Sequence, residues 1–410
     1  MAATLFENAT VLDVDAGELL PDRRVLVRGG QIAELGGREV SAPPGARVVD
    51  IRGMTLMPGL IDGHVHVTAV TADLARQAEW SPAYVTAKSA VVLRDMLGRG
   101  FTTVRDVGGA DYGLADAVAE GVLAGPRICF GGKGLSQTGG HGDIRSRGRV
   151  VMDRHPCRPS LGLVCDGVDA VRRAAREQLR TGAHHVKIML SGGVASPTDR
   201  VDSTQFSLDE IRAAVEEAEA ANRYVAGHAY SATAVNRGLA SGARSIEHGN
   251  LLDQTSIDLF RQHGAFYVPT LVTYQRLAAE GPEHGLPEES RRKVNDVLER
   301  GLGALELAHR GEVDIVFGTD LLGGMHRHQL DEFRIRSEVQ RSIEVIRSAT
   351  VTAARLLRLE GRIGRVVRGA TADLLVVDGD PLTDIGVLTR PDRCLKLVMK
   401  AGTVHVDATG

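Results

Sequence analysis

Eight short runs of apolar and β-branched residues recur along the middle of this 410-residue chain, and their spacing is the strongest constraint on its fold. Each run has the length and composition of a buried β-strand, and segments of helical periodicity separate the runs. The runs cover residues 60–67, 102–108, 127–132, 185–192, 224–230, 245–250, 265–271 and 314–321. Candidate helices between them include residues 168–179, 208–221 and 289–309. This alternation predicts an α/β fold, a closed (β/α)₈ TIM barrel. A doubly wound open sheet is the weaker alternative, because no GxGxxG follows the first run.

Both ends of the chain carry strand signals and lack helical ones. The signals lie at residues 24–27, 32–35, 372–381, 394–400 and 403–406, with glycines at the turns. Hairpins this short bury too little surface to be stable alone, so we expect the two ends to pair into one small β-sandwich. The predicted domains are therefore residues 1–57 plus 368–410 for the β-sandwich and 58–367 for the barrel.

The composition is that of an ordinary globular protein. Hydrophobic residues make up 43% of the chain and charged residues 25%, with a formal net charge of −3, which leaves no basic excess for nucleic acid or an anionic membrane. No signal peptide or long apolar stretch is evident, so we expect a cytoplasmic protein without a membrane partner. Scattered cysteines without CxxC spacing predict buried free thiols: Cys129, Cys157, Cys165 and Cys394.

Side chains that bind metals gather at the predicted strand ends. His64 and His66 end the first strand, and period-two alternation places both imidazoles on one face. An HxH pair suits zinc or a similar divalent ion but is a weak signal alone. Further ligand-type residues lie at the ends of strands four, five, six and eight: Lys187, His228, His248 and Asp320. Residues from separate strands converge at the C-terminal face of a barrel, and unpaired buried charge is unfavourable, so the set predicts a metal site.

The motifs around these residues resemble a known family over nearly the whole chain. Residues 57–66, MPGLIDGHVH, resemble the strand-one signature of the amidohydrolase superfamily. His228 in AGHAY, His248 in SIEHGN and Asp320 in FGTD resemble its ligands on strands five, six and eight. Lys187 resembles the carboxylated lysine of the binuclear members. The resemblance implies a binuclear metal centre on a TIM barrel.

Charge explains why a lysine belongs among metal ligands. A protonated Lys187 would repel two dications, whereas a carbamate formed with CO₂ is an anionic donor that can bridge them. Together with Asp320 and a bridging hydroxide, the carbamate would leave the site with a single net positive charge. Burial lowers the pKa of lysine and frees the neutral amine that CO₂ needs. The alternative is a lysine paired with a neighbouring carboxylate. The expected cofactors are two divalent ions, zinc first with cobalt, manganese or nickel as alternatives, and N6-carboxylysine at Lys187.

Three residues are the catalytic candidates. With two ions roughly 3.5–4 Å apart supplying a hydroxide, Asp320 would take its proton and pass it to the leaving nitrogen. By resemblance His141, which follows Gly139 and Gly140, contacts the substrate or its oxyanion. Tyr230 follows His228 by two residues and shares its strand face, so its hydroxyl could bind a substrate carbonyl or carboxylate, with packing as the alternative.

Two further polar segments have both functional and structural interpretations. In the loop 321–328, Arg327 or a neighbouring histidine could hold a substrate carboxylate, and a solvated loop explains the residues equally well. Arg105 and Asp106 are expected to form a structural pair at the barrel rim.

A narrower resemblance sets the expected activity. Residues 138–143, TGGHGD, and 228–230, HAY, are similar to the branch of Xaa-Pro and Xaa-Arg/Lys dipeptidases and carboxypeptidases that includes ochratoxin-type N-acyl amino acid amidohydrolases. This similarity implies hydrolysis of the amide bond of a small dipeptide or N-acyl amino acid, by a homo-oligomer. The alternatives are a lactonase, cyclic-amide or phosphotriester hydrolase with the same metals. A different class is an inactive scaffold, which the complete ligand set argues against.

Overall fold

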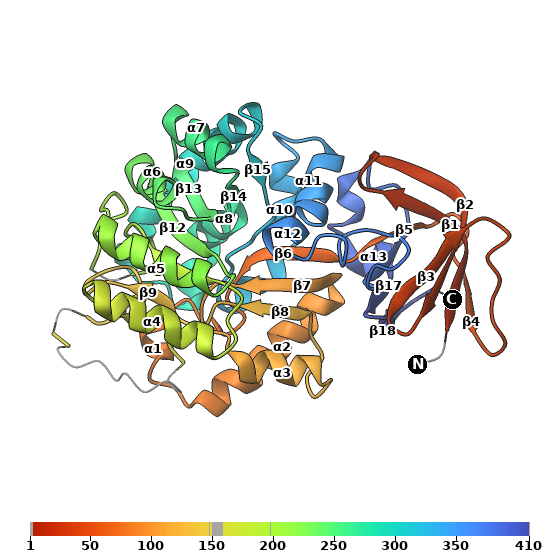
Figure 1. Ribbon diagram of the computed structural model, residues 1–410, viewed down its shortest axis with the longest axis horizontal. Helices are drawn as coiled ribbons and strands as arrows, with labels where there is room; N and C mark the ends of the chain where they lie inside the picture. Colours follow the sequence, from red (N-terminus) through yellow and green to blue (C-terminus); the bar gives the residue numbers. More distant parts are fainter. Residues whose placement is uncertain (1–2, 147, 150–158, 197, 410) are drawn as a thin grey trace.

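The protein consists of a barrel with a smaller β-rich module at one side (Figure 1). The structure, a computed structural model, describes residues 3–146, 148–149, 159–196 and 198–409. The barrel is built from the middle of the chain, whereas the β-rich module contains strands from both ends. Among the described residues, no helix is both long and apolar enough to cross a lipid bilayer.

Eight parallel strands form the barrel, one from each run predicted to be a strand. They are β6 (Leu60–Val65), β7 (Phe101–Asp106), β8 (Arg127–Phe130), β11 (Val186–Met189), β12 (Val225–Ser231), β13 (Ser245–Leu251), β14 (Phe266–Val268) and β15 (Asp314–Ile315). Neighbours pair in parallel from β6 to β8 and from β11 to β15. Backbone hydrogen bonds from His184 N to Phe130 O at 2.8 Å and from Gly63 N to Phe317 O at 2.7 Å bridge the two remaining gaps. The predicted barrel is confirmed.

Strand three extends further than its sequence pattern predicts. After β8 the chain continues as β9 (Gly134–Ser136), which pairs in parallel with β10 (Gly162–Val164) and meets β11 at Ile188. This extension leads directly into the segment that contains His141.

Helices surround the barrel (Figure 1). They are α1 (Leu74–Gln77), α2 (Pro82–Gly98), α3 (Tyr112–Ala119), α4 (Val168–Arg180), α5 (Leu208–Ala220), α6 (Ala232–Ala240), α7 (Gln254–His263), α8 (Leu271–Glu280), α9 (Glu288–Arg310), α10 (Asp331–Arg336), α11 (Ser342–Ser348) and α12 (Val351–Leu356), with 3₁₀ turns η1 (Gly281–His284) and η2 (Gly323–His328). The three predicted helices match α4, α5 and α9 within one residue at each end. A capping box starts α5, because the side chain of Ser207 accepts from the Glu210 amide and that of Glu210 accepts from the Ser207 amide.

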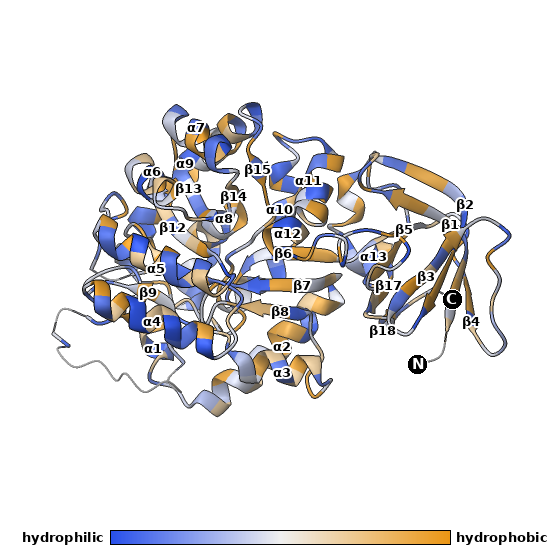
Figure 2. Ribbon diagram, in the orientation of Figure 1, coloured by the Kyte–Doolittle hydropathy of each residue, from blue (hydrophilic) through white to orange (hydrophobic). Residues whose placement is uncertain are grey.

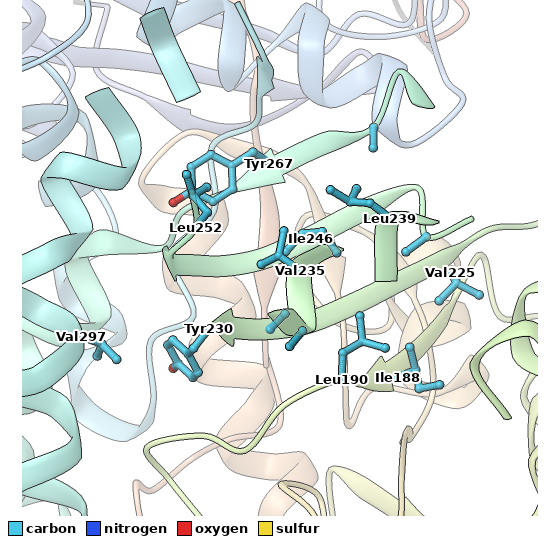
Figure 3. Close-up of a cluster of buried hydrophobic side chains, with 14 of the residues drawn as sticks. Ile188, Leu190, Val225, Tyr230, Val235, Leu239, Ile246, Leu252, Tyr267 and Val297 are labelled. Carbon is cyan, nitrogen blue, oxygen red and sulfur yellow. The ribbon is translucent and has the colours of Figure 1, made fainter. Parts of the chain in front are cut away.

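Amphipathic packing holds the helices to the strands. Figure 2 shows hydrophilic and hydrophobic residues alternating around α4 and α5, as expected for helices with one solvated side. Figure 3 shows part of the resulting core, where Ile246 of β13 lies near Leu239 of α6. This core supports the strands whose ends carry the candidate site.

The β-rich module joins the two ends of the chain in one hydrogen-bonded sheet. Its strands are β1 (Thr4–Asp13), β2 (Glu18–Arg28), β3 (Gln31–Gly36), β4 (Arg47–Asp50), β5 (Thr55–Pro58), β16 (Leu374–Val377), β17 (Leu395–Lys400) and β18 (Thr403–Asp407). The order is β18-β17-β16-β5-β1-β2-β3, with β4 paired to β1. The ends meet where β5 and β16 pair antiparallel, with Leu374 opposite Pro58. Between β16 and β17 lie the short η3 (Ile385–Val387) and α13 (Pro391–Cys394). The domain boundaries at 57/58 and 367/368 stay a prediction.

The described cysteines are free thiols. Cys129 and Cys165 are buried and Cys394 is partly buried, while Cys157 lies outside the described residues. Burial raises the pKa of the Cys129 thiol to about 11 and that of Cys165 to about 12. Both thiols are therefore protonated and unreactive at neutral pH.

Candidate metal centre

The C-terminal ends of β6 and β15 bring three metal-binding side chains together. His64 lies within β6, His66 follows it, and Asp320 lies on the chain leaving β15. Asp320 Oδ1 lies 3.3 Å from His64 Nε2 and 3.2 Å from His66 Nε2. Ligand atoms of the three residues lie within 4.8 Å of one another, close to the span of a single divalent ion. A hydrogen bond of 2.9 Å from Asp320 N to His64 O fixes the two chain segments together.

Two further imidazoles face this group from the adjacent strands β12 and β13. The ring centroid of His248 lies 4.9 Å from that of His64 and 4.6 Å from that of His228. His248 Nδ1 lies 2.8 Å from Thr270 Oγ1, which orients its ring. Burial lowers the pKa of His228 and of His248 well below the usual value. Both rings are therefore neutral, with a lone pair available for a metal.

Lys187 is buried in β11 beside these histidines. Its Nζ makes no hydrogen bond to any described residue. Burial lowers the pKa of Lys187 to about 8, although the carboxylates of Glu247 and Asp320 act in the opposite direction. A buried amine without an acceptor is unfavourable. A fraction of it is neutral at physiological pH, which is the form that reacts with CO₂.

The donor set fits a divalent metal centre. His64 Nε2, like Lys187 Nζ, is buried and makes no hydrogen bond within the described part of the chain. Burial raises the pKa of Asp320, but the adjacent His64 and His66 outweigh it and hold that pKa well below its usual value. The carboxylate is therefore ionised. Four imidazoles and a carboxylate are ligands that zinc and similar ions accept.

The backbone at two of these residues is strained. His248 has φ 76° and Asp320 has φ 53°, both in the left-handed region that side chains rarely adopt. Such conformations cost about 1–3 kcal/mol each and concentrate at functional sites. Here they turn both side chains toward the histidine cluster at the strand ends.

Glu247 is a functional residue that the sequence analysis missed. Its carboxylate Oε2 lies 2.7 Å from His64 Nδ1, and both its oxygens accept from Arg105 Nη2 at 2.7 Å. All three side chains are buried. Because a carboxylate can only accept, His64 carries its proton on Nδ1 and presents the lone pair of Nε2 to the centre. Alternation would place Glu247 and His248 on opposite faces, but the left-handed φ of His248 breaks the alternation.

The expected pair of Arg105 with Asp106 at the barrel rim is wrong. Arg105 is fully buried and pairs with Glu247, because alternation turns the two neighbours to opposite faces of β7. Asp106 accepts from the backbone amides of Val67 at 2.7 Å and Gly108 at 3.0 Å. It therefore fixes the loop that follows His66.

His141 lies against the histidine cluster. Its ring stacks on that of His228, with centroids 4.2 Å apart and an interplanar angle of 18°. His141 Nδ1 lies 2.9 Å from Ser196 Oγ, which leaves Nε2 as the ring nitrogen available to a bound substrate. Burial lowers the pKa of His141.

Tyr230 also contacts the cluster, at the end of β12 (Figure 3). Its ring stacks on that of His248 at 5.2 Å and meets that of His228 edge-on at 5.1 Å. Its hydroxyl lies 2.9 Å from that of Tyr274. Tyr230 is buried among these rings, so its position is compatible with substrate contact and with packing alike.

The side chains of the 321–328 loop are engaged within the protein. Arg327 forms an ion pair with Glu280 and donates to Gly324 O at 2.8 Å. His328 Nε2 lies 2.8 Å from Glu280 Oε1, and the buried His326 lies 3.1 Å from Ala69 O. A substrate carboxylate would have to compete with Glu280 for Arg327.

The chain is similar to known proteins over nearly its whole length. Residues 55–404 match the family model described as the amidohydrolase family. Ochratoxinase of Aspergillus niger is 33% identical over 364 residues, covering 85% of this chain and 75% of the relative. A crystal structure of a prolidase complexed with N-methylphosphonate-L-proline is 48% identical, with a TM-score of 0.96 and coverage of 98% of this chain and 99% of that chain. A crystal structure of a Xaa-Pro dipeptidase with bound methionine in the active site is 29% identical, with a TM-score of 0.87 and coverage of 98% and 99%. The chain belongs to the amidohydrolase family, in its ochratoxinase and dipeptidase group, and is a hydrolase of carbon–nitrogen amide bonds.

Proposed function

We propose that this protein is a binuclear metal-dependent amidohydrolase that cleaves the amide bond of a dipeptide or N-acyl amino acid. Two divalent ions would be held by His64, His66, Lys187 as a carbamate, His228, His248 and Asp320. The names of the similar proteins support the substrate class, because they comprise an ochratoxinase and proline dipeptidases, and the bound molecules are an amino acid and a proline derivative. Zinc is the expected ion, with cobalt, manganese and nickel as alternatives.

The observation that carries the proposal is the amine of Lys187, which lies among neutral imidazoles and an ionised carboxylate and is bonded to no residue that the structure describes. A structural lysine would pair with a carboxylate, but Glu247 is already bound by Arg105. Reaction of the neutral amine with CO₂ would form one N–C bond and release one proton. The product is an anion that supplies two oxygen donors where the protein otherwise presents a cation.

The chain's own residues would carry the proton transfers. When bound, the divalent ions supply an activated water and polarise the scissile carbonyl. Asp320 is ionised at neutral pH, so it can accept the proton of the attacking water and deliver it to the leaving nitrogen. An amide nitrogen leaves poorly as an anion, so this delivery matters more for an amide than for an ester.

His141 and Tyr230 would bind the substrate beside the ions. His141 stacks on His228 and has Nε2 free, so it can contact the acyl side of the scissile bond. The hydroxyl of Tyr230 can donate to a substrate carbonyl or carboxylate while it accepts from Tyr274. Assembly of the protein as a homo-oligomer stays a prediction.

The experiment is metal analysis combined with a substrate panel. Protein purified without chelator should contain about two divalent ions per chain and release amine from dipeptides or N-acyl amino acids. Chelation should abolish turnover, and added zinc or cobalt with bicarbonate should restore it. His64→Asn should lose metal and activity, whereas His263→Asn, at the exposed end of α7, should retain both.

Two outcomes would overturn the proposal. Faster turnover of lactones or phosphotriesters than of any amide would favour the other hydrolase activities. A protein without bound ions that hydrolyses nothing in the panel would favour an inactive scaffold.

A further inference from the structure

A lysine on an outer helix is bonded to the segment that covers His141. Lys293 of α9 donates from Nζ to three backbone carbonyls, Gly193 O at 3.2 Å, Ser196 O at 2.9 Å and Asp199 O at 2.7 Å. An ammonium group has three donors, so all of them are used on one segment of chain. Surface lysines are usually solvated, and this side chain is 20% exposed. Residue 197 of the segment lies outside the described residues.

The carboxylate of Asp199 completes this arrangement from inside. It accepts from the hydroxyl of Ser196, from Gly193 N at 3.1 Å and from Gln205 Nε2 at 3.1 Å. Lys293 Nζ lies 3.6 Å from Asp199 Oδ1. The side chain of Asp199 is 3% exposed. A buried carboxylate with these partners ties Gly193, Ser196 and Gln205 to one another.

The same segment contacts His141 from three directions. Ser196 Oγ lies 2.9 Å from His141 Nδ1, and Gln205, which is bonded to Asp199 of the segment, accepts with Oε1 from His141 N at 3.0 Å. A Cβ added to Gly193 would lie 2.1 Å from His141 Cε1, so the ring rests directly on the backbone of this glycine. On its other face the ring stacks on His228. The imidazole therefore lies between the segment and a candidate metal ligand.

The hydrogen-bond directions fix which nitrogen of His141 is available. Ser196 has one hydroxyl proton, and it donates this proton in a hydrogen bond to the Asp199 carboxylate, which can only accept. Ser196 Oγ must therefore accept from His141 Nδ1–H. Nε2 remains as the atom that a substrate can meet.

We propose that Lys293 is a positioning residue, which acts through Gly193, Ser196 and Asp199 to hold His141 with Nε2 directed to the substrate. The assignment of His141 as a substrate contact rests on the proposed function. The position of the segment rests on its hydrogen bonds to Lys293 and Asp199. A displacement of about 1 Å at a reacting group can lower the rate about 100-fold. Loosening the segment should therefore reduce turnover, although Lys293 is bonded to the segment and not to His141 itself.

The test compares Lys293→Met with the control Arg291→Met. Arg291 is exposed on the same helix, α9, and its only ion pair among the described side chains is with Glu288. Lys293→Met should lower kcat about 10- to 100-fold with KM changed less than threefold and metal content unchanged. Arg291→Met should match the wild type. Lys293→Arg, which retains charge and donors, should recover part of the loss. Ser196→Ala should lower kcat as well, which keeps the test open if Lys293→Met fails to fold.

Two further measurements separate positioning from general structural damage. In a His141→Ala background, Lys293→Met should cause no further loss, because both changes act on the same group. Hydrogen exchange at the amides of Gly193 and His141 should accelerate in Lys293→Met and stay unchanged in Arg291→Met. An additive loss in the His141→Ala background, or faster exchange with unchanged kcat, would overturn the positioning role and leave the proposed function standing. If the wild type hydrolyses no amide, the proposed function fails. Unchanged hydrogen exchange in Lys293→Met would separately refute the positioning role of Lys293.

Discussion

Replacing Lys187 with methionine should stabilise the metal-free protein. Methionine fills a similar volume. It also removes an ammonium group that donates no hydrogen bond to any described residue. Burial lowers the pKa of Lys187 from 10.5 to about 8. At 1.36 kcal/mol per pKa unit, holding the charged amine in the folded state costs about 3 kcal/mol at pH 7. The variant should gain about that free energy of unfolding.

The gain should depend on pH in a defined direction. Between pH 8 and 10.5 the unfolded chain keeps the Lys187 proton while the folded protein has released it. The unfolded state then binds more protons, so the stability of the wild type rises with pH and the advantage of the variant shrinks. The difference should fall from about 3 kcal/mol at pH 7 to about 1.4 kcal/mol at pH 9.5.

The assay is urea denaturation of chelator-treated protein in CO₂-free buffer at both pH values. Lys88→Met, a partly exposed change on α2, is the matched control and should show no pH-dependent difference. Zinc with bicarbonate should then stabilise the wild type more than it stabilises Lys187→Met, because only the lysine can form a carbamate. A Lys187→Met protein less stable than the wild type at pH 7, or a difference constant with pH, would refute an unpaired buried amine.

Three further substitutions test individual residues of the centre. Asp320→Asn should lower kcat by about 10²- to 10⁴-fold and retain most of its metal, as measured by steady-state kinetics and elemental analysis; normal turnover would exclude Asp320 as the proton carrier. Glu247→Gln leaves Arg105 without its carboxylate and should destabilise the protein by about 3–5 kcal/mol in urea denaturation, with metal affinity weakened about 10- to 100-fold in chelator competition. Tyr230→Phe should raise KM about tenfold or more, while Tyr112→Phe, exposed on α3, should not; an unchanged KM would show that Tyr230 only packs.

The barrel could be predicted because burial leaves a pattern in the sequence. Its strands are buried on both sides and read as continuous apolar runs, whereas its helices are buried on one side and show helical periodicity. These patterns are local, so α4, α5 and α9 emerge from sequence periodicity within one residue. The histidines of β6, β12 and β13 could be predicted because the residues next to each of them in the sequence form a strand pattern or a motif that indicates a ligand position. The extent of β15 could not be predicted in this way. Its two residues pair with β14, and the chain then continues beside β6 as far as Asp320 without being part of a regular strand.

The residues that orient the site could not be predicted because their partners are distant in sequence. Glu247 reaches His64 and Arg105 only after the barrel closes, and Lys293 lies nearly 100 residues from the backbone that it binds. Each side chain has an ordinary local context. Glu247 also escapes the alternation rule, because the left-handed backbone of His248 brings two consecutive side chains into the interior.

The pairing of β5 with β16 has a consequence for synthesis of the chain. These strands are joined in the sheet although their paired residues are more than 300 positions apart. At a translation rate of 5–20 residues per second, roughly 15 to 60 s pass before β16 follows β5 out of the ribosome. During that time β5 presents an open edge with the apolar residues Leu56 and Met57, the kind of edge that recruits strands from other chains. An N-terminal fragment that ends before β16 should therefore aggregate or bind chaperones when it is expressed alone. Co-expression of a C-terminal fragment that contains β16 to β18 should restore its solubility.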